Sequence, residues 1–356
     1  MKTTRDQLFK MPKIELHAHI GGSIRESTII ELINKKNKDP EAIKQILDSC
    51  RIDPKQSKEV GRRNLNECFK MFEVIHDLTS TDVTVMTRIT KETIEDYADD
   101  NVIYLELRTT PRAIGQNGSK YDYVTHVIKG IEDYYQSHPD SPIIVRLLLT
   151  IDRQKSLQEA KENIELAHTY PSKYIVGMDF SGNPFKGPFS NFQHLIKEAR
   201  EKHKLPFSIH MGEVLNDDEV LLIISTKPER VGHAVCWQSE STRDEFIRSQ
   251  IPLEVCLSSN HCTTTSREEG DHPFAEYAKT TNRSGMHMCL NCDDKGIFQT
   301  TTTDEYLMAA DDFSLSVEEF CEMQADMANY IFDKESIEGV RSQIIKYRDS
   351  LSSHVC

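Results

Sequence analysis

Short apolar runs recur along the chain, each followed by polar residues and then by a segment with helical periodicity. Most of these runs are too continuously apolar for a strand with one solvated face, which is typical of parallel strands covered on both sides. The segments between them have the length and mixed polarity of surface helices. We therefore predict eight strands, at Ile14–His19, Val102–Thr109, Ile143–Thr150, Tyr174–Phe180, Pro206–His210, Arg230–Ala234, Leu253–Leu257 and Met286–Asn291, and helices at Tyr121–Tyr135, Leu157–Thr169, Ser190–Lys202 and Ser241–Ser249.

The stretch between the first two predicted strands is far longer than one crossover helix. We predict a helical insertion over about residues 24–100, with loops around residues 53–54 and 61–63. A length of 356 residues allows two or three domains but also fits one barrel with insertions, so we predict a single domain over residues 1–356. Apolar residues at helical spacing support the insertion, namely Cys68, Phe69, Phe72, Ile75 and Leu78.

The composition limits the binding partners and the cellular location that we expect for the chain. The formal net charge of −14 argues against binding to nucleic acid or to an anionic membrane surface. Nine cysteines without regular spacing indicate reduced thiols. The first eleven residues lack the apolar core of a secretion signal, and no stretch approaches the roughly 18 apolar residues of a membrane span. We expect a cytoplasmic protein, and a monomer by default.

Residues of ligand or catalytic type follow the predicted strands. In a (β/α)₈ TIM barrel the carboxyl ends of all strands meet at the face that carries the active site. Such residues at the end of eight successive strands are hard to attribute to chance, so we predict this barrel rather than an open sheet. In chain order they are His17 and His19; Thr109, Thr110, Pro111 and Arg112; Asp152; Asp179, Ser181 and Gly182; His210 and Glu213; His233; Ser258, Ser259 and Asn260; Asp293 and Asp294.

Four of these residues have the chemistry of a metal site. His17 and His19 alternate on a strand, so both imidazoles can face the barrel mouth. Adjacent strand residues point in opposite directions, so we assign Asp293 as a ligand and Asp294 as a carboxylate that supports the site or contacts substrate. Alone, each motif is weak, because a core histidine or a solvated acidic pair looks the same. With His210, the three imidazoles and one carboxylate suit a single zinc ion, and cobalt or manganese would also fit.

The same residues occur in the order found in adenosine and AMP deaminases, a family that this sequence resembles. The resemblance extends over nearly the whole chain, from about Pro12 to the final helices. Finer features are similar to the adenosine deaminase-like branch, which acts on N6-methyl-AMP. They lie at Pro12–His19, Glu67–Phe72, Leu105–Arg112 and Asp293–Gly296.

This resemblance implies a mechanism. Zinc lowers the pKa of a bound water to roughly 7, and attack at purine carbon 6 requires a proton on ring nitrogen 1. By resemblance, Glu213 supplies that proton. His233 and Asp294 orient and deprotonate the water, and Gly182 offers its backbone N–H to the purine. The implied zinc ligands are His17, His19, His210 and Asp293.

Substrate choice is implied by further positions. Adenosine deaminases carry an aspartate two residues beyond the second histidine, whereas this chain has Gly21, which removes a charge that would repel a 5′-phosphate. Arg112 has the paired donors that match a phosphate. We therefore expect hydrolysis of N6-methyl-AMP, and of other N6-substituted purine monophosphates, to IMP and an amine. The expected substrate contacts are His19, Gly21, His76, Thr109, Thr110, Pro111, Arg112, Asp152, Gly182 and Asp294.

Three alternatives stay open at this point. One is a deaminase of adenosine or deoxyadenosine that gives inosine. Another is a barrel that binds purine nucleotides without turnover, although a full set of ligands and proton carriers argues against it. The last is a two-metal amidohydrolase. Such enzymes often use a carboxylated lysine after the fourth strand, where this chain has Asp179-Phe180-Ser181-Gly182, so one metal is favoured.

Overall fold

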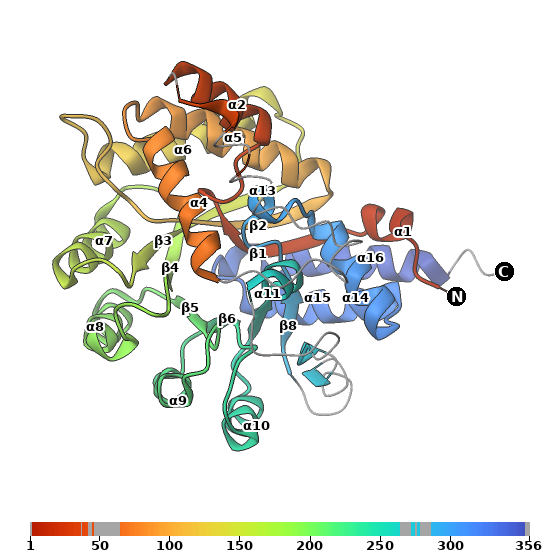
Figure 1. The fold of residues 1–356 in the computed structure, drawn as a ribbon. Helices are drawn as coiled ribbons and strands as arrows, with labels where there is room; N and C mark the ends of the chain where they lie inside the picture. Colours follow the sequence, from red (N-terminus) through yellow and green to blue (C-terminus); the bar gives the residue numbers. More distant parts are fainter. Residues whose placement is uncertain are drawn as a thin grey trace.

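The computed structural model describes residues 2–36, 38–41, 45, 65–263, 272–274, 276–277 and 286–352. The predicted loops around residues 53–54 and 61–63 lie outside these ranges. Eight parallel strands form one sheet in chain order, at the centre of the molecule (Figure 1). They are β1 Lys13–His19, β2 Val102–Thr109, β3 Ile144–Asp152, β4 Ile175–Ser181, β5 Phe207–Met211, β6 Arg230–His233, β7 Leu253–Val255 and β8 Met288–Leu290.

The sheet closes on itself through the segment that follows β8. Ala18 of β1 forms a parallel bridge with Asp293. The His19 N–H donates to the Asp293 carbonyl at 3.1 Å, and the Asp293 N–H donates to the His17 carbonyl at 2.9 Å. The predicted (β/α)₈ TIM barrel is therefore confirmed, and its closure brings a proposed metal ligand onto β1.

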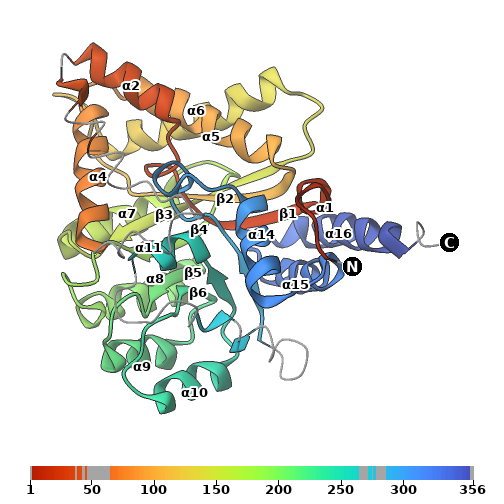
Figure 2. The ribbon, with the colours of Figure 1, turned by 45° about the vertical axis from the view of Figure 1, so that its right-hand side comes forward.

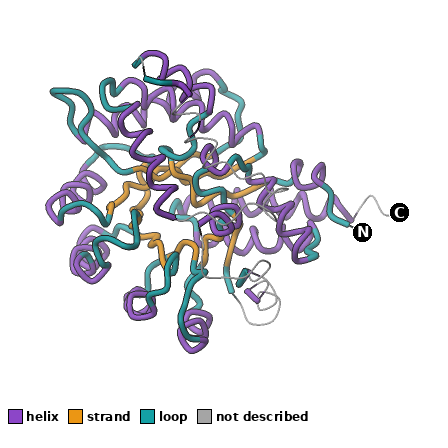
Figure 3. The backbone as a smooth tube through the Cα atoms, in the orientation of Figure 1, coloured by secondary structure: helices purple, strands orange, loops and turns teal. Residues whose placement is uncertain are grey.

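Helices surround the strands, as the tube in Figure 3 shows. Capping boxes begin several of them; for example, Ser119 and Asp122 start α6, and Ser156 and Glu159 start α7. The α-helices are α1 Arg5–Lys10, α2 Glu26–Lys35, α4 Leu65–Leu78, α5 Thr84–Asp99, α6 Lys120–Ser137, α7 Leu157–Thr169, α8 Gln193–His203, α9 Asp217–Thr226, α10 Glu240–Ser249, α11 Leu257–Thr263, α13 Lys295–Phe298, α14 Thr302–Phe313, α15 Val317–Met327 and α16 Ile337–Ser352; short 3₁₀ turns lie at Phe189–Asn191, Ala328–Tyr330 and Lys334–Ser336.

The insertion between β1 and β2 contains α2, α4 and α5. Helix α4 crosses in front of the strands in Figure 1 and lies to their left in Figure 2. Its apolar positions Met71 and Ile75 are buried, while other residues of the same helix line a cavity at the barrel mouth. Of the helices that the structure describes, none has the length and apolarity needed to cross a membrane.

Candidate active site and metal centre

A cavity of about 130 Å³ lies at the carboxyl ends of the strands, under α4. Ten of the residues predicted from the sequence line it: His19, His76, Thr110, Asp152, Gly182, His210, Glu213, His233, Asp293 and Asp294. Five predicted residues do not line it: His17, Gly21, Thr109, Pro111 and Arg112. His17 is fully buried next to the cavity, 3.5 Å from Asp293 through its Nε2.

The four predicted ligands come together at this cavity. The ring centroid of His17 lies 5.3 Å from that of His19 and 4.6 Å from that of His210. Asp293 Oδ1 lies 3.4 Å from His19 Nε2. His233 is part of the same cluster, with its ring centroid 4.9 Å from that of His210.

The donor set fits a metal ion. The Nδ1 of His17 is 2.8 Å from a Glu254 carboxylate oxygen, an arrangement that fixes the tautomer of a metal-ligating histidine. Its Nε2 is buried and has no hydrogen-bond partner, so a lone pair faces the cluster. The possible ligand atoms of His17, His210 and His233 lie within 4.8 Å of one another, as do those of His17, Cys256 and Asp293, so these groups share three residues with the predicted ligand set but do not contain His19. A buried histidine-rich set with one carboxylate is chemistry that zinc prefers.

The acidic pair after β8 differs from the prediction in one respect. Strand alternation predicts opposite directions for Asp293 and Asp294, yet both line the cavity. The reason is the backbone: Asp293 has a φ of 60°, in the left-handed region, and lies beyond the end of β8. Alternation does not apply to a residue in that conformation, so both carboxylates face the same space.

Three glycines make room for site side chains. A Cβ at Gly232 would lie 2.6 Å from Cε1 of His17, and one at Gly22 would lie 1.7 Å from Oδ1 of Asp294. At Gly182 the φ of +104° disfavours any other residue, and a Cβ there would lie 2.4 Å from Asp152 Oδ1. These close approaches fix where the two carboxylates and the imidazole can be.

Burial and mutual charge shift the acidity of the cluster. Burial, and then the neighbouring Asp293, raise the pKa of Asp294 well above its ordinary range. Burial lowers the pKa of His233. For His210 burial acts in the same direction, but Asp179 and Glu213 outweigh it and raise the pKa to about 10. Burial acts to raise the pKa of Glu213, but His233 and His210 outweigh it, so the pKa falls. The site thus combines protonated and unprotonated groups at neutral pH.

Cations gather on one side of the cavity. Removal from water, and then the charges of Arg112 and Lys155, lower the pKa of His76 to about 4. Arg112 donates to Thr79 Oγ1 at 2.6 Å, and its guanidinium lies 5.2 Å from the Tyr123 ring centre. Within the part of the chain that the structure describes, neither Arg112 nor Lys155 forms an ion pair with a carboxylate. Sequence reasoning missed Lys155, whose signal is its place in the loop after β3.

Buried charged residues form a network inside the barrel. Arg108 donates to Asp179 at 2.8 Å and to Glu254 at 2.7 Å. Arg230 donates to Glu254 at 2.6 Å and pairs with Glu106. All five side chains are fully buried. Asp179 was noted from the sequence only as a ligand-type residue after the fourth strand, and the other four were not predicted, because none of them lies at the carboxyl end of a strand.

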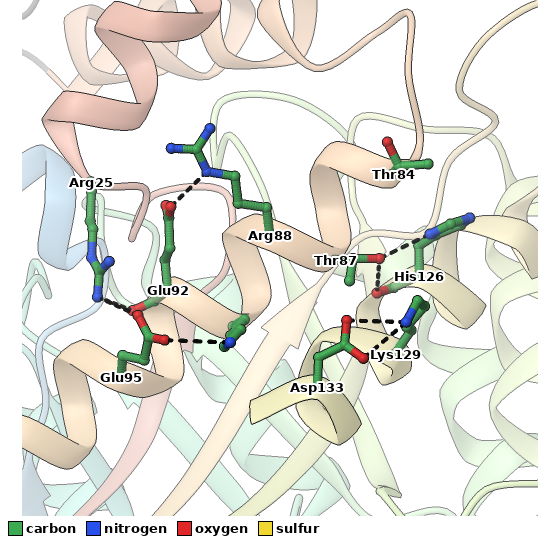
Figure 4. A pocket seen from close by; sticks show the side chains of 10 residues that line it. Arg25, Thr84, Thr87, Arg88, Glu92, Glu95, His126, Lys129 and Asp133 are labelled. Carbon is green, nitrogen blue, oxygen red and sulfur yellow. Dashed lines mark hydrogen bonds and ion pairs between the residues drawn. The ribbon is translucent and has the colours of Figure 1, made fainter. Parts of the chain in front are cut away.

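A second hollow, of about 440 Å³, lies outside the barrel along α5 and α6 (Figure 4). Its charged side chains are already paired with one another. Arg88 lies 2.7 Å from Glu92, and Lys129 lies 2.9 Å from Asp133. Arg25 and Lys91 likewise pair with Glu95. Imidazoles and carboxylates instead converge at the barrel mouth, where we assign the active site.

Comparisons with known proteins agree with this geometry. The adenosine deaminase family profile matches residues 12–347. An N6-mAMP deaminase of Arabidopsis thaliana is 36% identical over 87% of this chain and 89% of its own, and an N6-methyl-AMP deaminase of Homo sapiens is 34% identical over 97% and 95%. A solved Arabidopsis ADAL–IMP complex has a TM-score of 0.85 at 33% identity, covering 99% and 100%. The chain belongs to the adenosine deaminase family and is a hydrolase that deaminates purines.

Proposed function

We propose that the chain hydrolyses N6-methyl-AMP, and other N6-substituted purine monophosphates, to IMP and an amine. The observation that carries this proposal is the cavity in which imidazoles and carboxylates converge, with the charges of Arg112 and Lys155 close enough to lower the pKa of His76 in its lining. Relatives bearing the name N6-methyl-AMP deaminase, and a solved relative in complex with IMP, support the same substrate class.

In this proposal His17, His19, His210 and Asp293 hold one zinc ion. When bound, the ion supplies Lewis acidity that makes a water nucleophilic at neutral pH. The unpartnered Nε2 of His17 is the observation that favours a metal here.

Asp294 and His233 have different tasks. The Asn260 side-chain amide lies 3.1 Å from His233 Nδ1, and its oxygen lies 3.2 Å from His272 Nε2. His233 Nε2 lies 3.2 Å from His210 Nδ1, and both residues line the cavity; in this proposal His233 orients the attacking water. Asp294 then accepts the proton, since it lines the cavity and its buried Oδ1 has no hydrogen-bond partner.

The purine lies against Gly182 and Glu213 in this scheme. The Glu213 pKa is lowered in the metal-free site, so in this proposal Glu213 takes up a proton when substrate binds and passes it to ring nitrogen 1. The proton that Asp294 accepts from the water then goes to the leaving amine, and the second water hydrogen returns to Glu213 as the product carbonyl forms. The Gly182 backbone N–H donates to the ring, and Asp152 lies behind it. Thr110 and His76 line the side of the cavity nearest Arg112 and Lys155, which we assign to the 5′-phosphate.

The test is turnover of zinc-loaded protein on N6-methyl-AMP, AMP and adenosine side by side, with products separated by chromatography. We expect IMP to form fastest from N6-methyl-AMP. Inosine from adenosine alone would keep the deamination chemistry and reject the phosphate assignment. No turnover on any of the three, with tight nucleotide binding, would favour a barrel that only binds.

Three variants separate chemistry from phosphate recognition. Glu213→Gln removes the proton donor and should lower the rate on every substrate by about 10²–10⁴-fold. Lys155→Ala and Arg112→Ala should raise KM for N6-methyl-AMP while leaving N6-methyladenosine, which lacks the phosphate, unchanged. Equal effects of the lysine and arginine variants on both compounds would contradict the phosphate assignment.

A further inference from the structure

We propose that Glu254, on β7, is a positioning residue for the metal centre: it holds the His17 ring with Nε2 directed at the metal, while Arg108 and Arg230 hold Glu254. This inference rests on the metal site of the proposed function and goes beyond it, because none of these three residues contacts substrate or belongs to the proposed ligand set.

The contact between Glu254 and His17 defines the imidazole. Both side chains are fully buried, and Glu254 Oε2 lies 2.8 Å from His17 Nδ1. A carboxylate accepts only, so the ring hydrogen lies on Nδ1 and the lone pair on Nε2. On the other side, a Cβ at Gly232 would lie only 2.6 Å from the ring, so the ring is confined between Glu254 and the β6 backbone.

Glu254 is itself fixed by donors from four strands. Its Oε2 also accepts from Arg108 Nη2 of β2 at 2.7 Å. Its Oε1 accepts from Arg230 Nε of β6 at 2.6 Å and from Ser208 Oγ of β5 at 2.8 Å. With His17 of β1, these contacts use both carboxylate oxygens. Because every donor belongs to the barrel wall, the carboxylate cannot rotate away from His17 without losing several hydrogen bonds.

The network of buried charges extends from Glu254 to residues that do not contact the proposed metal site. Arg230 pairs with Glu106 and its guanidinium lies 3.7 Å from the Phe332 ring centre. Glu106 accepts from the Phe332 backbone N–H at 2.8 Å. Buried ion pairs contribute little net stability compared with apolar packing. Their concentration beneath one imidazole therefore points to orientation of His17 rather than to stability alone.

Glu106 offers a matched control for Glu254. Both are fully buried glutamates that pair with Arg230, but only Glu254 contacts a histidine of the cluster. We would prepare full-length Glu254→Gln and Glu106→Gln proteins. Two quantities would be measured for each: the zinc dissociation constant, by competition with a chromophoric chelator, and the thermal stability of the metal-free protein.

We expect both variants to lose stability in the metal-free form, because each leaves Arg230 with one carboxylate fewer. Only Glu254→Gln should also weaken zinc binding, by about 10–100-fold, the range typical for partners of metal ligands. Glu254→Asp retains the charge for both arginines but ends one methylene short of His17. It should weaken zinc binding in the same way, and it replaces Glu254→Gln if that variant does not fold.

Zinc dissociation constants that change equally in the Glu106 and Glu254 variants would overturn the inference and leave the metal site intact. A wild-type protein that binds no zinc would instead overturn the proposed metal site, and the inference with it.

Discussion

At the scale of single residues, some side chains of the site pack so closely against glycine backbone that a methyl group would not fit between them. Gly21 and Gly22 are adjacent, but only Gly22 lies against a site residue: its Cβ would come within 1.7 Å of Asp294, while a Cβ at Gly21 meets nothing within 4 Å. Gly22→Ala should therefore displace Asp294 and lower kcat/KM by about 100-fold, as displacements of about 1 Å at reacting groups do. Steady-state kinetics on N6-methyl-AMP measure this.

Gly21→Ala is the control and should change kcat/KM by less than a factor of about 3, since its methyl group has space. It also tests the sequence-based assignment of Gly21 to the phosphate region. A rise in KM for the nucleotide alone would mean that the Gly21 backbone takes part in phosphate binding after all.

Most residues that line the cavity could be predicted from the sequence, because ligand-type side chains rarely follow so many buried strands by chance. Glu254, Arg108 and Arg230 could not be predicted in this way. A charged residue inside a short apolar run looks like a solvated strand position, and only the closed barrel brings residues 108, 230 and 254 into contact. The place of Lys155 after the third strand was a signal in the sequence, but its approach to His76 could not be predicted, because that distance depends on the fold.

At the scale of elements, α4 provides the apolar wall of the cavity. Phe69 and Phe72 of this helix line it, with ring centroids 5.9 Å apart. Stacking of a base on an aromatic ring contributes about 1–3 kcal/mol. Phe72→Ala should therefore raise KM for N6-methyl-AMP by roughly 5–150-fold with a smaller effect on kcat. Lys70→Ala changes an exposed position of the same helix and should leave both constants unchanged. Equal effects of the two variants would mean that the substitutions alter KM by destabilising α4 and not by removing a contact with the base.

Helix α14 carries a buried acid that makes stability depend on pH. Glu305 accepts from Thr300 Oγ1 at 2.8 Å and from the Ser258 N–H at 3.1 Å. Burial raises its pKa from 4.5 to about 7. The folded state therefore binds this proton more tightly than the unfolded state, so the stabilisation is complete below about pH 4.5 and is lost as the pH rises through 7.

Glu305→Gln mimics the neutral acid and should remove this part of the pH dependence. Between pH 5 and pH 8 the wild-type unfolding free energy should fall by about 2 kcal/mol more than that of the variant. Urea unfolding at both pH values measures the difference. Parallel curves for the two proteins would show that Glu305 is ionised in the folded state at pH 5.

Element boundaries followed from the sequence wherever local signals exist. Helix α7 begins and ends where predicted, at Leu157 and Thr169, because a capping box marks its start. The last two strands are shorter than predicted. Leu257 already begins α11, and the chain after Leu290 bends toward the site through the left-handed Asp293. Apolar residues at the ends of these two predicted strands pack in the core without joining the sheet. Hydrophobic periodicity indicates that a residue is buried, but it does not show whether its backbone pairs with a neighbouring strand.

At the scale of the whole molecule, barrel closure positions Asp293, a proposed metal ligand, through backbone hydrogen bonds alone. Backbone hydrogen bonds on both sides of Asp293 tie it to His17 and His19 of β1. Removing the metal with a chelator should therefore abolish turnover and leave the far-ultraviolet circular dichroism unchanged, with a lower melting temperature because the ligand no longer stabilises the folded state. Zinc should restore activity without a refolding step, whereas loss of secondary structure on chelation would mean that the metal holds the barrel closed.

Metal binding should also be coupled to proton release. In the metal-free protein the pKa of His210 is raised to about 10, so its imidazole is protonated at pH 7.5. A histidine must lose its extra proton to ligate a metal. Titrating zinc into metal-free protein at this pH should therefore release at least one proton, which calorimetry detects as a binding enthalpy that varies with the ionisation enthalpy of the buffer. His210→Gln, which has no such proton, should show a weaker dependence on the buffer, and an unchanged dependence would place the released proton on another group of the cluster.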